Sequence, residues 1–258
     1  MSSAPPPRIA IPQWLIPILI FAGLAGLVVL SNRPALTPLG VPVVRDSAEY
    51  KRRSDEALEL CRGPLEKFGD VQELTDDQRK DVEQAYKLYD AMFRYNPVAV
   101  EPPFQAGRCA YLLGDLREAE DLITQSIYNS EQGLKQNAQS SDKTTVRNIQ
   151  LTRAEAQYSL GLVYIQAELY EKAVGEFDAA IETVPNSPAY LAGRASALIQ
   201  LRKLPEAMRD VATALALDPK HTRSLQLAKL IDAELKAGGS SAGGSSAGGG
   251  SSGGGNAP

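Results

Sequence analysis

Histidine and cysteine are scarce in this sequence, which has one histidine, His221, and two cysteines, Cys61 and Cys109. A lone imidazole leaves no second histidine for a typical metal cluster and no evident base for a serine or cysteine nucleophile. The two cysteines match neither a CxxC redox pair nor a zinc set. We expect both to be small buried residues of helices. A disulfide between them is the alternative if this part of the chain faces an oxidising compartment. The sequence therefore predicts no catalytic residue, no metal site and no cofactor, and we expect that the protein is not an enzyme.

Basic residues are not in excess either. Lys and Arg number 27 against 31 Asp and Glu, which gives a net charge of -4. A nucleic-acid binder normally carries a basic surplus on one face, so no nucleic-acid partner is expected. The carboxylates of Glu118, Glu171 and Glu206 lie beside basic residues, as solvated surface charges do. No small-molecule substrate is expected, because nothing singles out a group of residues that would bind one.

Charge is missing altogether from Ile9 to Asn32, a run of about 24 residues that is long enough for a helix to cross a bilayer. We predict a single transmembrane helix at 9–32, preceded by a polar tail at 1–8 and followed by a proline-rich spacer at 33–44. A cleaved signal peptide is the alternative, but the apolar run is longer than a usual signal core. Basic residues flank the two ends about equally, so the side of the membrane that holds the rest of the chain is left open.

Capping and breaking residues predict two helices in the next part of the chain. The first begins near Ser47 and is expected to end at about Cys61, because Gly63 and Pro64 follow it. The second begins at Thr75, whose side chain can cap it, and runs to about Tyr95. We therefore expect a helical hairpin directly after the spacer.

The stretch 154–187 carries a periodic pattern with the spacing L-G-x2-Y, then A-x3-F-x2-A, then P. Its members are Leu160, Gly161, Tyr164, Ala173, Phe177, Ala180 and Pro185. This pattern resembles the tetratricopeptide repeat (TPR), a pair of helices with a period of roughly 34 residues. Gly161 would let the two helices approach closely, and Phe177 would fill the space between them. The resemblance implies an all-α fold, a TPR-type α-solenoid, which here follows a single N-terminal transmembrane helix.

The same spacing divides the rest of the chain into units. We predict a helical unit with a degenerate repeat at 45–99, repeats at 100–133, 154–187 and 188–221, an insert at 134–153, a capping helix at 222–236 and a disordered Gly/Ser tail at 237–258. Ser141 or Asp142 is expected to start a helix that continues into the next repeat. An insert in a solenoid lies on one face, often a binding face, although a solvated extension without a partner is the alternative.

In the TPR family, the first helices line a concave groove that usually holds a peptide or a partner helix. The resemblance implies that residues at i, i+4 and i+7 of each first helix face this groove. The candidates for partner binding are Phe104, Arg108, Tyr111, Tyr158, Leu162 and Ile165. Such a surface suits an apolar or amphipathic helix, with Arg108 pairing a carboxylate at the rim. The alternative is that the insert helix or the degenerate N-terminal unit fills the groove itself.

The function that the resemblance implies is protein binding, and the predicted transmembrane helix would place this binding at a membrane. We expect a scaffold or assembly factor that recruits a protein or peptide partner through the TPR groove. A receptor for targeting peptides or amphipathic helices is a second hypothesis, and a regulatory subunit of a membrane enzyme complex is a third. The scaffold predicts stable co-purification with a membrane complex, whereas the receptor predicts an open groove that binds short helices in isolation.

Overall fold

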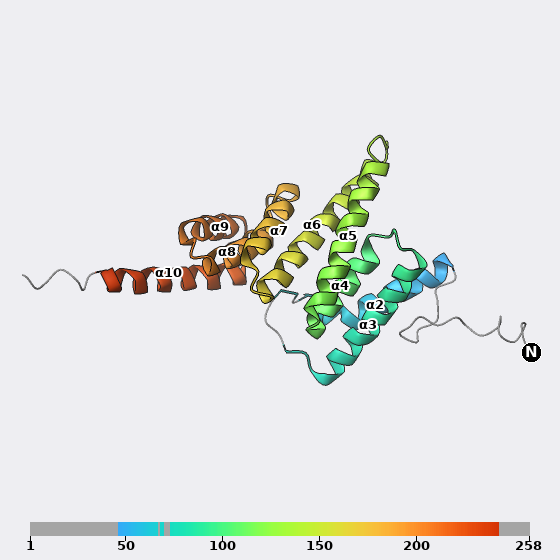
Figure 1. Cartoon of the computed structure of the whole chain (residues 1–258), viewed down its shortest axis with the longest axis horizontal. Coiled ribbons are helices and arrows are strands. Elements are labelled where there is room, and N and C mark those ends of the chain that lie inside the picture. Colours follow the sequence, from blue (N-terminus) through green and yellow to red (C-terminus); the bar gives the residue numbers. More distant parts are fainter. Residues whose placement is uncertain (1–45, 67, 70–72, 243–258) are drawn as a thin grey trace, which may run out of the picture.

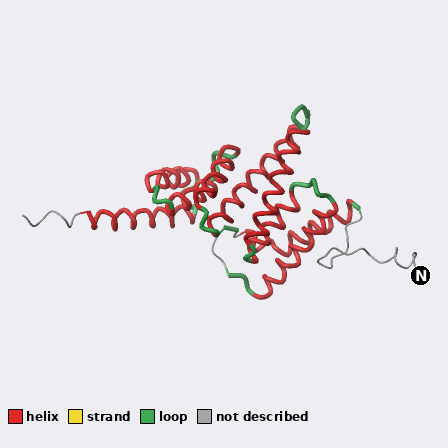
Figure 2. Tube along the Cα trace, viewed as in Figure 1, coloured by secondary structure: helices red, strands yellow, loops and turns green. Residues whose placement is uncertain are grey.

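The structure, a computed structural model, describes residues 46–66, 68–69 and 73–242, and its regular secondary structure over these ranges is entirely helical (Figures 1 and 2). The helices are α2 (Ser47–Glu66), α3 (Asp76–Tyr95), α4 (Glu101–Leu113), α5 (Leu116–Gln136), α6 (Lys143–Gln166), α7 (Tyr170–Thr183), α8 (Pro188–Gln200), α9 (Leu204–Leu217) and α10 (Thr222–Ala242). The predicted transmembrane helix at 9–32, with its flanking segments at 1–8 and 33–44, lies outside the described residues. None of the helices from α2 to α10 is long and apolar enough to cross a membrane.

The helices form a solenoid, as the sequence predicted. Each helix packs against the next one along the chain, and alternate helices also touch, α2 with α4, α4 with α6, α6 with α8 and α8 with α10. A series in which every second helix contacts its counterpart in the next unit buries a continuous core between repeats. The even-numbered helices therefore form one side of the array, which is the side on which the sequence places the groove.

Phe177 of α7 lies in a core that α4, α5, α6, α7 and α8 share. Its side chain is fully buried, and it lies between two helices that each present a glycine to its ring. A Cβ atom added to Gly161 of α6 would lie 2.6 Å from the ring atom Cε1, and one added to Gly193 of α8 would lie 2.7 Å from the same atom. Both distances are far below van der Waals contact, so only glycine allows this approach on either side. The predicted packing of Gly161 against Phe177 is confirmed.

The turns inside three successive helix pairs share one backbone geometry. Gly114, Glu168 and Arg202 adopt left-handed conformations, with φ angles of 89°, 61° and 60°. In each turn the backbone N–H of the following residue donates to the carbonyl five residues earlier, at 2.8 to 2.9 Å. This bond satisfies a carbonyl that the end of a helix leaves without an intrahelical partner. The same combination of a left-handed residue and a hydrogen bond to the carbonyl five residues earlier therefore forms the turn between the two helices of each pair.

Two predicted helix starts are confirmed by side-chain caps. Thr75 accepts a hydrogen bond from the backbone of Gln78, whose side chain bonds back to Thr75, so that α3 begins with a complete capping box. Asp142 accepts from the backbone N–H groups of Thr144 and Thr145 and begins α6. The residues of the insert lengthen α5 and α6 rather than forming a separate unit, and this hairpin projects beyond its neighbours at the top of Figure 1.

Two predicted helix ends are wrong. α2 does not end near Cys61 but continues through Gly63 and Pro64 to Glu66. A proline in the last turn interrupts few backbone bonds, and burial of the Pro64 and Leu65 side chains stabilises the extra turn. α10 continues past residue 236 to Ala242, six residues into the predicted tail, because adding residues to an existing helix is much easier than nucleating one. The remainder of the tail, 243–258, lies outside the described residues.

The two cysteines belong to different helices that the fold brings together. Cys61 of α2 and Cys109 of α4 are both free and buried. The Cys61 thiol donates to the carbonyl of Ala57 at 2.9 Å, and the closeness of the two thiols lowers the pKa of Cys61 and raises that of Cys109. They therefore act as small buried core residues at the α2–α4 contact, as the sequence predicted.

Candidate partner-binding groove

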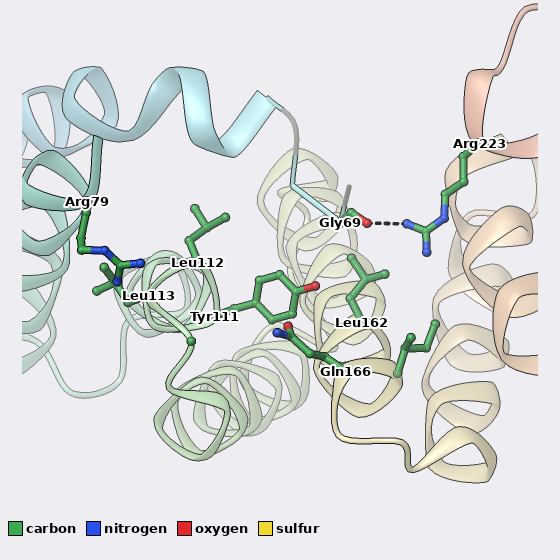
Figure 3. A pocket seen from close by; sticks show the side chains of 10 residues that line it. Gly69, Arg79, Tyr111, Leu112, Leu113, Leu162, Gln166 and Arg223 are labelled. Carbon is green, nitrogen blue, oxygen red and sulfur yellow. Dashed lines mark hydrogen bonds between the residues drawn. The ribbon is translucent and has the colours of Figure 1, made fainter. Parts of the chain in front are cut away.

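The six residues predicted to bind a partner all line two neighbouring cavities along α4 and α6. The first cavity, of about 320 Å³, is lined by Phe104, Arg108 and Tyr158. The second, of about 370 Å³, is lined by Tyr111, Leu162 and Ile165 (Figure 3). We refer to the two cavities together as the α4–α6 groove. Their role in binding a partner stays a prediction.

The six residues differ in how much they are open to solvent. Phe104 and Leu162 are each only 2 % exposed, so they form the floor of the groove and belong to the core as well. Tyr111, Tyr158 and Ile165 are partly exposed and form its walls. Only the wall residues therefore present a large surface to a bound molecule.

A segment of the same chain lies in the groove. Past the end of α2, the ring of Phe68 packs on the ring of Tyr111, with centroids 5.0 Å apart. The guanidinium of Arg108 lies over the Phe68 ring at 4.5 Å, and its Nη2 atom donates to the carbonyl of Leu65 at 3.2 Å. Arg108 is thus largely covered rather than placed at the rim, where the sequence suggested it. The degenerate N-terminal unit, through Leu65 and Phe68, occupies part of the groove.

Gly69 continues this segment into the second cavity. Arg223, at the start of α10, donates from Nη1 to the carbonyl of Gly69 at 2.7 Å, across 154 residues of sequence (Figure 3). Gly69 has a left-handed φ of 91°, and an added Cβ atom would lie 2.7 Å from Leu162 Cδ1 and 3.3 Å from the hydroxyl of Tyr158. Because both the conformation and the space exclude a side chain, this position accepts only glycine without strain.

The electrostatics of the groove are dominated by arginine. Burial lowers the pKa of Arg108, and the carboxylate of Glu155 opposes this effect. Loss of surrounding water raises the pKa of the Glu155 carboxyl, which lines the first cavity, and Arg108 opposes that increase. Burial also raises the pKa of Tyr111, against the opposing charge of Arg223. Since arginine stays protonated in proteins, the groove presents fixed donors for carbonyl or carboxylate oxygens.

This arrangement suits the binding of a polypeptide. It combines aromatic and aliphatic walls with two guanidinium groups that donate to backbone carbonyls, Arg108 and Arg223. Within the described residues, no group of three His, Cys, Asp or Glu side chains is placed to hold a metal ion. The groove can therefore hold a polypeptide by its side chains and main chain together.

The sequence did not single out several residues of the groove. The missed residues are Leu65, Phe68, Gly69, Glu155, Tyr190 and Arg223. Tyr190 stacks on Tyr158 with ring centroids 4.9 Å apart, and it stands three residues after Ser187 in a helix start that the repeat spacing does locate. For Phe68, Gly69 and Arg223 there was no signal, since they lie outside the first helices of the recognisable repeats.

Part of the chain matches a known protein family. The model of the tetratricopeptide repeat matches residues 150–188 and 158–222 of this chain. The matched residues include α7, α8 and α9 and the part of α6 that lines the groove.

The solved structures that match this chain share little sequence with it. A structure of MamA from residue 41 to its end, from Desulfovibrio magneticus RS-1, is 16 % identical, covers 73 % of this chain and 90 % of that one, and has a TM-score of 0.49. YrrB, described as a TPR protein with an unusual peptide-binding site, is 14 % identical over 67 % of this chain and 99 % of its own, with a TM-score of 0.29. PilF of Pseudomonas aeruginosa is 14 % identical, covers 74 % of this chain and 90 % of its own, and has a TM-score of 0.31.

Proposed function

We propose that the chain is a membrane-anchored scaffold or assembly factor that holds a protein partner in the α4–α6 groove, a proposal supported by the match of residues 150–222 to the tetratricopeptide repeat model. The observation that carries this proposal is the groove itself. Two arginines there donate to main-chain carbonyls of a segment that lies across its aromatic walls. Hydrogen bonds to carbonyl oxygens bind polypeptide of any sequence, while an aromatic contact selects among side chains.

The anchor in this proposal is supported by the sequence. The run from Ile9 to Asn32 contains no charged residue and carries Trp14 near one end, where an aromatic ring is favoured at a membrane surface. A proline-rich spacer, 33–44, separates this run from α2. The solenoid would therefore be held close to the bilayer but free of it, so that the groove stays accessible to a partner.

A second candidate function, a receptor for peptides, is favoured by one observation. The segment in the groove contributes only a few residues, and its contacts combine a ring, a glycine and two carbonyls. A short peptide can supply all of these, whereas a scaffold for a folded partner would use a wider surface. The two candidates share the same groove and differ in the size of the molecule bound.

The groove assignment predicts where a partner can be trapped. A photoreactive phenylalanine analogue at position 165 of the full chain in its native membrane is expected to form adducts with a protein partner, because Ile165 lines the second cavity. The same analogue at Met208, which is 50 % exposed on α9 and lines neither cavity, serves as the matched control and is expected to form none of these adducts. Equal trapping from both positions, or none from position 165, would rule the groove out as the partner site.

The anchor predicts resistance to alkaline extraction. The full chain is expected to stay in the membrane pellet, and the double substitution Ile20→Arg and Leu24→Asp is expected to release it. Each charge at the centre of a membrane helix costs about 2.5–3.5 kcal/mol, enough to prevent stable insertion when both are present. The conservative pair Ile20→Leu and Leu24→Ile is the control and should stay in the pellet. An unmodified chain that is extracted as readily as the charged variant would contradict the anchor.

A further inference from the structure

The segment after α2 lies in the groove in the manner of a bound peptide. Phe68 lies between the ring of Tyr111 and the guanidinium of Arg108, and it contacts both the core around Phe177 and the core between α2 and α4. Two arginines from distant helices, α4 and α10, then bond to two carbonyls of the segment, Arg108 to Leu65 and Arg223 to Gly69. Main-chain bonds, one aromatic contact and one position restricted to glycine are the elements by which proteins recognise short linear motifs.

Arg108 is an unusual residue for a site that serves packing alone. Among the described residues it forms no ion pair, and its Nε atom is buried without an acceptor. An apolar side chain in its place would fill the same space without a buried charge to solvate. Within its own helix the guanidinium contacts only the Gln105 side chain, at 3.3 Å, and the Phe104 ring, at 5.4 Å. The Leu65 carbonyl and the nearer Phe68 ring add a main-chain acceptor and a closer aromatic face, which are contacts that an occupant of the groove supplies.

The segment also leaves room beside it. The first cavity borders Leu65 and Phe68, and the second borders Gly69, so free space of about 320 and 370 Å³ remains on the two sides of the segment. A longer occupant could use both spaces and would gain contacts with Tyr158, Tyr190 and Ile165 that the segment does not fully use. The segment therefore fills the groove only in part, and a ligand that makes more contacts with the groove can displace it.

We infer that residues Leu65, Phe68 and Gly69 are a built-in competitor for the α4–α6 groove, and that the partner is a polypeptide segment with the same chemistry, an aromatic residue followed by glycine. This inference rests on the proposed function, and it adds the identity of the recognised motif and its regulation. Because the competitor is tethered, its effective concentration is on the order of millimolar, and a partner must overcome it. The groove is thus closed to weak or non-matching segments and opens to a matching one.

A binding experiment with the purified full chain tests this inference. The probe is a fluorescent peptide with the sequence of residues 62–72, RGPLEKFGDVQ, and its control is the same peptide with alanine in place of phenylalanine. Removing the competitor with Phe68→Ala is expected to tighten binding of the probe by about tenfold or more, since a site that is open only a tenth of the time binds about ten times more weakly. Gly69→Val should act in the same way, because its side chain would collide with Leu162. The measurement is fluorescence anisotropy.

The matched control chain is Phe93→Ala, which removes a partly buried phenylalanine of α3 that lines neither cavity of the groove. It is expected to bind the probe as weakly as the unmodified chain. Circular dichroism of each variant identifies any that do not fold. If either Phe68→Ala or Gly69→Val does not fold, the other variant alone tests the removal of the competitor.

Three results would overturn the inference. The unmodified chain could bind the probe as tightly as Phe68→Ala, in which case the segment does not compete. The Phe68→Ala chain could bind both peptides equally, in which case the aromatic residue is not recognised. No variant could bind the probe, in which case the partner has a different chemistry. Photo-trapping from position 165 decides the proposed function separately, because it requires a partner in the groove but no particular motif in that partner.

Discussion

Replacing Phe177 with alanine is expected to lower the free energy of unfolding by about 3–5 kcal/mol, the usual cost of removing a large side chain from a packed core. Phe177 is fully buried, and its ring fills the space between Gly161 and Gly193. Two helices that present glycines have no side chains with which to fill the cavity, so the surrounding structure can collapse only in part. Since small domains are stable by about 5–15 kcal/mol, the effect is a large share of the total.

Urea unfolding followed by circular dichroism measures this loss, and Met208→Ala provides the control. Met208 is half exposed, so its replacement is expected to change stability by about 0.5 kcal/mol or less. A loss below about 1 kcal/mol for Phe177→Ala would show that the ring contributes little to this core.

A second substitution separates the glycine contact from the general effect of a cavity. Gly161→Ala alone places a methyl group 2.6 Å from the Phe177 ring and is expected to destabilise the protein by about 1–3 kcal/mol. In the Phe177→Ala background the obstructing ring is gone, and alanine in a helix is favoured over glycine by about 1 kcal/mol. The sign of the effect should therefore reverse, which a double-mutant cycle measures directly. An unchanged sign would mean that Gly161 is required by its backbone or by another neighbour.

The parts of the fold that the sequence predicts are those whose contacts are local. Gly161 and Phe177 are only 16 positions apart in the printed sequence, and the repeat spacing places them on facing helices. The helix starts at Thr75 and Asp142 depend on bonds within three residues, so they too were predictable. Positions at i, i+4 and i+7 share a helix face, which is why all six candidate residues line the same groove.

The occupant of the groove could not be predicted because it depends on contacts between distant parts of the chain. The bond from Arg223 to Gly69 joins the capping helix to the segment between the first two described helices. Repeat patterns describe how each unit meets its neighbours, and they contain no information on the path of a segment outside the repeats. The local stop signal at Gly63 and Pro64 was overridden by tertiary packing, since Leu65 is buried and Arg108 donates to its carbonyl at the end of α2.

The ion pair that connects α7, α8 and α9 should be the most sensitive polar contact of the solenoid. Arg194 of α8 makes two hydrogen bonds to the carboxylate of Asp210 on α9, at 2.8 and 2.6 Å, and a third to Asp178 on α7 at 2.7 Å. The side chain of Asp210 is only 9 % exposed, whereas that of Asp178 is 54 % exposed. The bonds to Asp210 are the main reason that the pKa of Arg194 is raised above its usual value. The energetic importance of the cluster therefore lies with Asp210.

Replacing Arg194 with methionine is expected to lower the free energy of unfolding by about 2–3 kcal/mol. Loss of one partner from a buried pair costs about 3–5 kcal/mol, and this figure is reduced here because Arg194 retains 26 % exposure to solvent. The cost comes from the Asp210 carboxylate that is left without a cation, so adding Asp210→Leu to the Arg194→Met chain should restore about half or more of the lost stability. Asp178→Ala, the exposed control, should cost about 0–1 kcal/mol. If Asp178→Ala were as costly as Arg194→Met, the stabilisation would come from the link between α7 and α8 rather than from the neutralised charge between α8 and α9.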